Sequence, residues 1–443
     1  MKALGLVILA TAGAGILALA AFALRSVLKD GLFRSSQPPL TGSAPIVSTP
    51  ADARIQRAQR AIEQAPNKPD GYNQLASAYL QKARETDDKG FHAKAEAALA
   101  RSFEAEADNY EAIKLRAKLL LTYHRFREAL ETAQRAQRMR PDDHDVYGQI
   151  TDALVELGEY GGAVKAAQQM VDLRPDSASY ARVSYLRSLH GDTAGAVEAM
   201  RAAVKTANPG DPESVAWSRV HLGSELMNAG NVTEAEGEFD RALLTFPGYR
   251  LAIEGKARAR VAAGDIPGAV AIYERQQTEA PSADVALALG DLYTHLGNTD
   301  EAQKQYEVFE ALERENVVAE NSWQHLINYW LDHDKNLEQA LALAQQEYES
   351  RKDIFTCDAL AWALFKSGRT AAARVFAAEA LRLGTRDGRI NYHAGMIYKA
   401  LGMRNEAVKH LKLSIQMNTF DRLQAETAKK ALDELTETHR DKR

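Results

Sequence analysis

The sequence has only one cysteine, Cys357, in 443 residues. A single thiol excludes an intrachain disulfide, so cysteine usage carries no information about the redox compartment. Cys357 falls at an inward position of a helical pattern, where we expect it to serve as a small buried apolar residue.

Clusters of positive charge are also missing. The chain has 55 Lys and Arg against 60 Asp and Glu, which gives a formal net charge of −5. Residues 1–50 contribute four basic residues and one acidic residue, or +3, and the remainder therefore carries −8, with 51 basic and 59 acidic residues. An acidic balance without basic clusters argues against nucleic acid as a partner.

Motifs with catalytic spacing are absent from the sequence as well. It has no phosphate-binding glycine loop followed by Lys-Ser/Thr, no Gly-x-Ser-x-Gly turn and no His-Glu-x-x-His pair. Asp332, His333 and Asp334 could be drawn as metal ligands. Consecutive residues at a helix end point in different directions, however, which favours a solvated turn. The sequence therefore predicts no metal and no cofactor.

What the sequence does contain is a regular spacing. Ten residues, most of them glycine, follow one another at intervals of 33 to 39 residues, and each precedes an alanine by five positions. The ten residues are Gly90, His124, Gly158, Gly191, Gly230, Gly264, Gly297, Lys335, Gly368 and Gly402, and the alanines are Ala95, Ala129, Ala163, Ala196, Ala235, Ala269, Ala302, Ala340, Ala373 and Ala407. Glycine suits a left-handed helix C-cap, and alanine lets two helices approach to ~8–10 Å.

This period resembles the tetratricopeptide repeat (TPR) family over residues 67–420. The fold class predicted is all-α: a TPR superhelical solenoid of about ten helix–turn–helix repeats, in which each unit touches only its neighbours. We expect an N-terminal capping helix at 51–66 and a C-terminal capping helix and tail at 421–443. Because the repeats occupy 67–420, no segment is left for a catalytic domain, and we do not expect an enzyme.

A long apolar run opens the chain. Ala3–Leu24 is uncharged, and as a helix it would be about 33 Å long, enough to span a bilayer. Residues 1–33 are therefore predicted to be a transmembrane anchor. A cleavable signal peptide is the alternative, because small-x-small sequences occur at 18–20 and 21–23. Residues 34–50, rich in Ser and Pro, are predicted to be a flexible linker.

Strings near the C-terminus, at 358–364, 383–387 and 393–396, resemble those of bacterial TPR proteins with N-terminal export or anchor sequences. The resemblance implies a bacterial envelope protein, and together with the N-terminal apolar run we expect a single-pass protein of the inner membrane. The basic residues Arg25, Lys29 and Arg34 would place its bulk in the cytoplasm by the positive-inside rule. Insertion of the short N-terminus after Lys2 would place it outside. We expect the TPR domain to be periplasmic, or secreted if the N-terminus is cleaved.

In TPR proteins, the first helix of each unit lines a concave groove, and the residues ten and six positions before the turn project into it. The binding residues predicted in this way are Lys114, Lys118, Tyr185, Arg258, Tyr329, Trp362 and Tyr392. The two lysines lie four apart on one helical face. They form a single pair without the asparagines that complete the carboxylate clamp of chaperone-binding TPRs. The aromatic residues suit a peptide groove, with packing between repeats as the alternative.

The function expected from these features is that of a non-catalytic, membrane-tethered scaffold. It would hold a peptide or protein in the concave TPR groove during envelope complex assembly. Two alternatives are a self-assembling structural TPR protein and an accessory subunit of an enzyme-maturation complex, the latter resting on analogy of fold. The partners expected are a protein or peptide ligand, the membrane through the N-terminal helix, and a second copy in the self-assembling case.

Overall fold

The computed structural model describes residues 49–320, 322–417 and 422–437. These residues form 22 helices and no strand. The helices are α2 (Pro50–Gln64), α3 (Pro69–Thr86), α4 (Gly90–Ala105), α5 (Tyr110–Thr122), α6 (Phe126–Met139), α7 (His144–Glu156), α8 (Tyr160–Leu173), α9 (Ser177–Leu189), α10 (Thr193–Thr206), α11 (Pro212–Asn228), α12 (Val232–Thr245), α13 (Arg250–Ala262), α14 (Ile266–Glu279), α15 (Ala283–His295), α16 (Thr299–Glu320), α17 (Gln324–Asp332), α18 (Leu337–Ser350), α19 (Ile354–Lys366), α20 (Thr370–Ala380), α21 (Gly388–Ala400), α22 (Arg404–Met417) and α23 (Arg422–Glu437).

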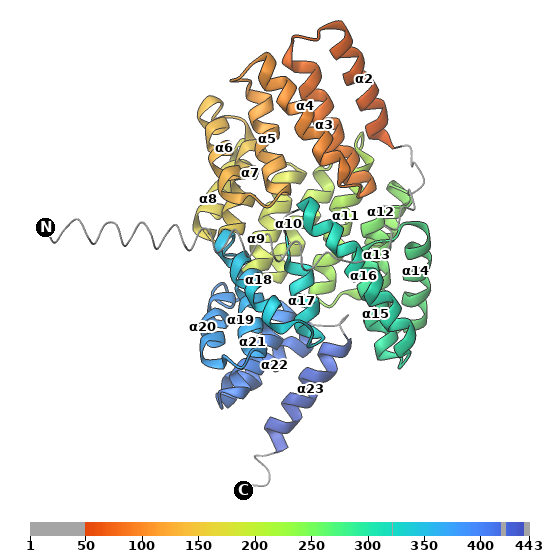
Figure 1. Cartoon of the computed structure of the whole chain (residues 1–443), viewed down its shortest axis with the longest axis vertical. Coiled ribbons are helices and arrows are strands. Elements are labelled where there is room, and N and C mark those ends of the chain that lie inside the picture. The colour runs from red at the N-terminus through yellow and green to blue at the C-terminus, as the bar shows by residue number, and fades with distance from the viewer. Residues whose placement is uncertain (1–48, 321, 418–421, 438–443) are drawn as a thin grey trace, which may run out of the picture. The chain divides into compact units, whose positions relative to one another are not determined.

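The helices from α3 to α22 form ten consecutive antiparallel pairs, flanked by α2 and α23 (Figure 1). In each pair the odd-numbered helix comes first and the even-numbered helix second. The prediction of an all-α chain with about ten helix–turn–helix repeats is confirmed. The apolar segment expected to span a membrane lies outside the described residues. Among the described residues, no helix is both long and apolar enough to cross a bilayer.

The turn between the helices of a pair follows one hydrogen-bonding pattern. After α7, the N–H of Gly158 donates to the carbonyl of Val155 (2.9 Å), and that of Glu159 donates to Leu154 (2.8 Å). These two bonds form a Schellman cap, which requires a left-handed residue, and the φ of Gly158 is +73°. His124 adopts the same conformation, with φ +52°, so it replaces the turn glycine of its unit as predicted.

The structure corrects two of the ten turn positions. In the first unit the left-handed residue is Asp87, with φ +56°, while Gly90 is the first residue of α4. In the eighth unit it is Asp334, with φ +52°, and the N–H of Lys335 closes the cap on the carbonyl of Trp330 at 2.7 Å. Asp tolerates the left-handed region better than most non-glycine residues, which explains why a glycine-based reading missed both positions.

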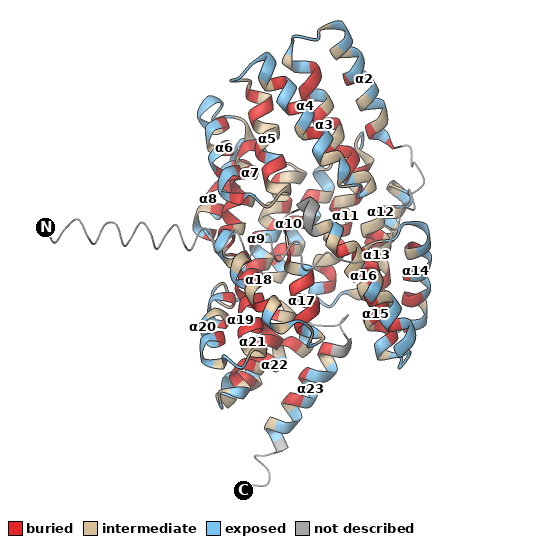
Figure 2. Cartoon of the chain, viewed as in Figure 1, coloured by how far each residue is buried: buried red, intermediate tan, exposed pale blue. Residues whose placement is uncertain are grey.

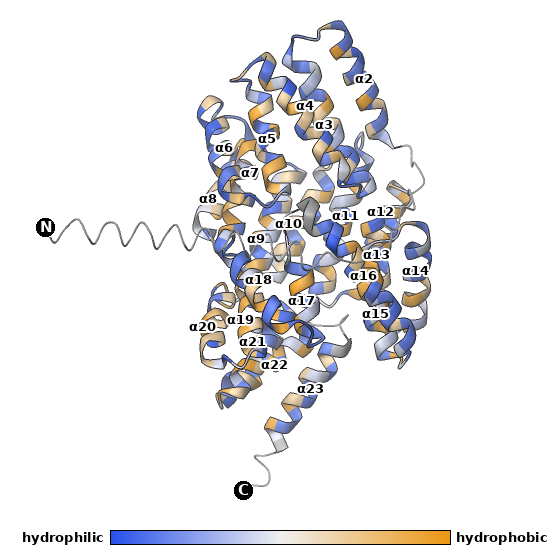
Figure 3. Ribbon diagram, viewed as in Figure 1, coloured by the Kyte–Doolittle hydropathy of each residue, from blue (hydrophilic) through white to orange (hydrophobic). Residues whose placement is uncertain are grey.

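The small residues predicted at helix crossings are buried. All ten alanines that the sequence pattern singled out have at most 3% of their surface exposed. The large residue four positions later fills the space between units, and Phe239, Tyr273, Tyr306 and Leu411 are all buried. Figure 2 shows buried residues along the faces where helices meet, and Figure 3 shows apolar residues on those faces. Packing of these faces builds the core.

Acidic side chains start many of the helices. The carboxylate of Asp192 accepts the N–H of Gly195 at the start of α10, and that of Asp265 accepts the N–H of Gly268 at the start of α14. Asp353 caps α19 by accepting the N–H groups of Phe355 and Thr356. Such caps stabilise a helix by ~1 kcal/mol each and fix where it begins.

The expectation that each unit touches only its neighbours is wrong. The N–H of Lys352, in the loop before α19, donates to the carbonyl of Glu156 at the end of α7 (2.9 Å). The N–H of Ile354 donates to the hydroxyl of Tyr160 (2.9 Å), 194 positions earlier in the sequence. Contacts are not limited to neighbouring units because the superhelix coils tightly enough for its successive turns to touch.

Candidate functional site

One cavity, of about 960 Å³, lies against the first helices of the first four units. Its wall comes mainly from α3, α5, α7 and α9, with α2 at one end. The lining residues are Arg54, Arg57, Asp70, Asn73, Gln74, Ser77, Glu111, Lys114, Leu115, Lys118, Leu121, Asp145, Gln149, Asp152, Met170, Ala178 and Arg182. The helices present these residues at intervals of three or four positions, which places them on one face of each helix.

Lys114 is held by acidic groups. Its Nζ lies 2.9 Å from Asp143, 3.4 Å from Glu111 and 3.7 Å from Asp145. Burial alone would lower the pKa of Lys114, but the hydrogen bond to Asp143 and the surrounding carboxylates raise it above its ordinary value. Lys114 therefore stays charged and has its charge compensated within the protein.

Lys118, one helical turn later, is different. Its side chain is exposed to the cavity, and no acidic side chain pairs with it within the described ranges. The positive charge of Arg84, desolvation of the Lys118 amine and the positive charge of Arg182 together lower the pKa of Lys118 to about 8. Lys118 is thus a cation that neighbouring positive charges repel. A bound anion would reduce this repulsion.

The remaining charged groups of the cavity are largely paired. Arg182 binds Asp152 through two hydrogen bonds of 2.8 and 2.6 Å. Arg54 donates to Gln81 at 2.5 Å. Arg57 is exposed and, like Lys118, has no acidic partner in the part of the chain that the structure describes. Among the described residues, three cations of the cavity therefore have no acidic partner: Arg54, whose partner Gln81 is neutral, Arg57 and Lys118; Asp70 is an exposed acid at its edge.

Two amide side chains of the cavity were missed by the sequence analysis. Asn73 donates to Asn109 (2.8 Å) and accepts from the hydroxyl of Ser102 (2.7 Å), so its amide is engaged between units. Gln149 donates to the carbonyl of Lys114 (3.0 Å), while its buried Oε1 has no hydrogen-bond partner. Position 148 is the groove position predicted ten residues before the turn residue Gly158, and Gln149 directly follows it. Shifting the count by one residue would have identified Gln149.

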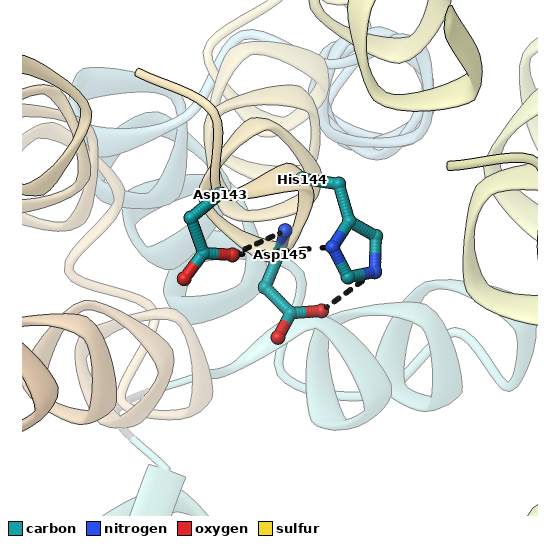
Figure 4. A group of neighbouring side chains, drawn as sticks. All are labelled: Asp143, His144 and Asp145. Carbon is teal, nitrogen blue, oxygen red and sulfur yellow. Dashed lines mark hydrogen bonds and ion pairs between the residues drawn. The ribbon is translucent and has the colours of Figure 1, made fainter. Parts of the chain in front are cut away.

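Among the described residues, one group has carboxylate and imidazole atoms close enough to hold a metal ion: Asp143, His144 and Asp145, whose ligand atoms lie within 4.8 Å of one another (Figure 4). The Asp143 carboxylate already accepts from Tyr110 (2.7 Å), from Lys114 (2.9 Å) and from the backbone of Asp145 (3.0 Å). A cation would have to displace Lys114, so this group is better described as a helix cap within an ion-pair network.

The predicted aromatic residues gather around a second cavity of about 550 Å³. Tyr329, Trp362 and Tyr392 line it but are only 1%, 3% and 8% exposed. Trp362 stacks on His393 with the ring centroids 4.2 Å apart, and its Nε1 donates to Asp332 at 3.2 Å. These three aromatic side chains form the wall between repeats, which is the packing arrangement considered beside the groove role.

The other two predicted binding residues lie apart. Tyr185, on α9, is 43% exposed and lines a third cavity of about 570 Å³. Arg258, on α13, is exposed and lines none of these three cavities. The structure therefore brings together Lys114 and Lys118 at one site and the three aromatic residues at another.

Known protein families account for this architecture. Profiles described as tetratricopeptide repeat match residues 149–212, 221–284 and 255–311, and a second such profile matches 388–420. These stretches of the chain are TPR repeats. TPR proteins in general are scaffolds for protein–protein interaction. No curated protein sequence matches this TPR chain.

Three solved structures match parts of this chain at low sequence identity. A tetratricopeptide repeat protein from Parabacteroides merdae has 18% identity and a TM-score of 0.41, over 56% of this chain and 96% of that one. The human IFIT1 dimer with m7Gppp-AAAA has 14% identity and a TM-score of 0.48, over 75% and 77%. YrrB, described as a TPR protein with an unusual peptide-binding site, has 18% identity and a TM-score of 0.27, over 46% and 98%.

Proposed function

We propose that this TPR protein is a non-catalytic scaffold that holds an extended, anionic segment of a partner protein in the cavity lined by α3, α5, α7 and α9. The observation that carries the proposal is the exposed, uncompensated ammonium of Lys118 in a cavity whose other charges are mostly paired. A carboxylate or phosphate at this position would supply the missing partner.

The size of the cavity supports an extended segment. Packed helices lie ~8–10 Å apart, so four consecutive first helices present a wall roughly 25–30 Å long. An extended chain advances by about 3.3 Å per residue, so this wall accommodates about eight residues. Hydrogen bonds to charged groups contribute about 1.5–3 kcal/mol each, enough for Lys118 to orient such a segment.

The proposal is tested by isothermal titration of residues 49–443 with N-acetyl-hexaglutamate amide at pH 6.5 and low salt. We expect binding that weakens about tenfold or more in Lys118→Gln. The matched control is Lys165→Gln, because Lys165 is an exposed lysine of α8 outside the cavity. Equal affinity in the two variants, or no binding by the unmodified protein, would contradict the proposal.

We also propose that residues 1–33 tether the scaffold to the bacterial inner membrane, with the TPR domain on the periplasmic side and residues 34–50 as the linker. The uncharged run Ala3–Leu24 and the Ser- and Pro-rich segment after it support this arrangement. Alkaline extraction of membranes and N-terminal sequencing of the mature protein test it. Release by carbonate, or a mature N-terminus after residue 20, would rule out the retained anchor.

A further inference from the structure

We propose that Arg84 is a second ligand-binding cation of this cavity. Without a ligand Arg84 pairs with Glu213, so anion binding competes with this contact between distant repeats. This inference rests on the proposed function and adds a residue and a coupling to it. It is carried by the row of residues on α3, by the contact between Arg84 and Glu213, and by the position of Lys118.

Arg84 is not among the residues that line the cavity, but it lies on the same face of α3 as two that do. Asp70 and Ser77 line the cavity seven residues apart, and Arg84 follows seven residues after Ser77. Seven residues correspond to about two helical turns, so the three side chains lie on one face of the helix. Arg84 is 41% exposed, and its long side chain can reach along that face toward the cavity.

The guanidinium of Arg84 is also in contact with a distant repeat. Its Nη2 donates to Glu213 at 3.4 Å, across 129 positions in the sequence. Glu213 lies in the first turn of α11 and only 3% of its side chain is exposed. A charge-assisted hydrogen bond at its optimum measures ~2.7–2.9 Å, so the contact at 3.4 Å is a loose one. The contact therefore holds Arg84 less firmly than an ion pair of ideal geometry would.

Lys118 and Arg84 influence each other. Arg84 is the largest cause of the lowered pKa of Lys118, and among the groups that face this lysine Arg182 acts in the same direction while Asp145 and Glu213 oppose it. The two cations therefore lie close enough to repel each other. A carboxylate or phosphate placed between them would convert this repulsion into two attractive contacts.

Competition follows from the burial of Glu213. When an anion draws Arg84 toward Lys118, Glu213 retains the hydroxyl of Tyr249 at 3.3 Å but has no other cation paired with it among the described residues. A buried carboxylate that loses its cation is destabilised, so the free energy of anion binding is reduced by this loss. Binding at the cavity therefore loosens the contact between the first unit and α11, and the two events are linked reciprocally.

The experiment compares Arg84→Gln and Glu213→Gln by the same titration with N-acetyl-hexaglutamate amide at pH 6.5. We expect Arg84→Gln to weaken binding about tenfold, and Glu213→Gln to strengthen it about threefold or more. If Arg84 served only to join the repeats, both variants would break the same contact and change the affinity in the same direction. That outcome would overturn the inference.

The matched control for charge is Asp87→Asn. Asp87 lies at the end of α3, pairs with Arg250 at 3.2 Å and has a left-handed φ, which asparagine tolerates. This variant removes one negative charge from the same region without freeing Arg84, and we expect its affinity to stay within about twofold. If Asp87→Asn strengthened binding as much as Glu213→Gln, the loss of any nearby negative charge would explain the effect. That result would contradict the inference.

A second readout does not depend on the peptide. The Nζ of Lys118, followed by NMR in a sample with labelled lysine, should titrate at higher pH in Arg84→Gln than in the unmodified protein; an unchanged titration overturns the inference. Loss of binding in Lys118→Gln, together with parallel effects of the two variants, would leave the proposed function standing and remove only the role of Arg84. Absence of peptide binding by the unmodified protein would remove both.

Discussion

Arg351 forms an ion pair with Glu156 across 195 positions of sequence, and its guanidinium also binds Asp353 at 3.0 Å. The neighbouring backbone bond from Lys352 to Glu156 makes this a contact between main chains as well as side chains. One apolar cluster continues through it, from Leu154 and Leu157 to Ile354, Cys357 and Ile390. The third and fourth units therefore pack against the ninth and tenth.

Replacing Gly158 by alanine tests this contact between the third and ninth units. A Cβ at this position would lie 2.5 Å from the carbonyl oxygen of Lys352, in addition to the strain of φ +73°. At Gly297 the φ is +77° but no atom lies within 4 Å of the added Cβ, so Gly297→Ala is the matched control. We expect the control to cost roughly 1–2 kcal/mol and Gly158→Ala a further ~1–3 kcal/mol in thermal or urea denaturation. Equal costs would show that the backbone contact does not limit the packing.

The buried His393 makes stability depend on alkaline pH. It lies 2.8 Å from Asp358 and 3.8 Å from Asp332. Burial alone would lower its pKa, but these two carboxylates raise it to about 9. Since the folded pKa exceeds the unfolded value of 6.5, the stabilisation is complete below pH ~6.5 and is lost as the pH rises through 9, by roughly 3 kcal/mol in total.

The measurement is the urea midpoint of the protein and of His393→Gln at pH 7 and pH 10. We expect the unmodified protein to lose more stability between these two values than the variant does. His221 provides the control, because burial lowers its pKa to about 4 and it is neutral at both pH values. A variant at His221 should keep the full alkaline loss, whereas an equal loss in His393→Gln would contradict the assignment.

Truncation of Trp362 should cost far more than truncation of Tyr185. Trp362 is 3% exposed, stacks on His393 and donates to Asp332, so Trp362→Ala should destabilise the protein by about 3–5 kcal/mol. Tyr185 is 43% exposed, and Tyr185→Ala should cost about 1 kcal/mol or less. Urea denaturation compares the two. Similar small costs would mean that Trp362 does not hold the repeats together.

Lys118 should be unusually reactive toward acylating reagents. With a pKa of about 8, a larger fraction of its amine is neutral and nucleophilic at pH 8 than for an ordinary lysine. Brief acetylation at pH 8 followed by peptide mass spectrometry should label Lys118 before Lys165. Prior incubation with the hexaglutamate peptide should protect it. Labelling of both lysines at one rate would show that the cavity does not perturb Lys118.

The repeat architecture could be predicted from the sequence because it depends on local requirements. Every unit needs a left-handed turn residue and a small residue in the helix that follows, and in eight of the ten units these are five positions apart. The prediction failed in two units, where Asp87 and Asp334 take the left-handed position instead of the predicted Gly90 and Lys335. Position in the repeat also identified Lys114 and Lys118 as neighbours in one cavity.

Contacts between successive turns of the superhelix could not be predicted in this way. They depend on small rotations between units that add up over several repeats, and no residue type marks them. The pairs Arg84–Glu213 and Arg351–Glu156 are of this kind. For the same reason the sequence could not distinguish Lys114, which is compensated, from Lys118, which is not, although both stand at groove positions.

Site-specific photo-crosslinking in cells tests most directly whether this cavity is the interaction surface. A benzophenone amino acid at position 74, where Gln74 is exposed in the cavity, keeps both lysines intact, and the same amino acid at position 165 on α8 is the control. We expect one discrete crosslinked product at position 74 that disappears with Lys118→Gln and is absent at position 165. No product at position 74, or the same product from both positions, would contradict the proposed function.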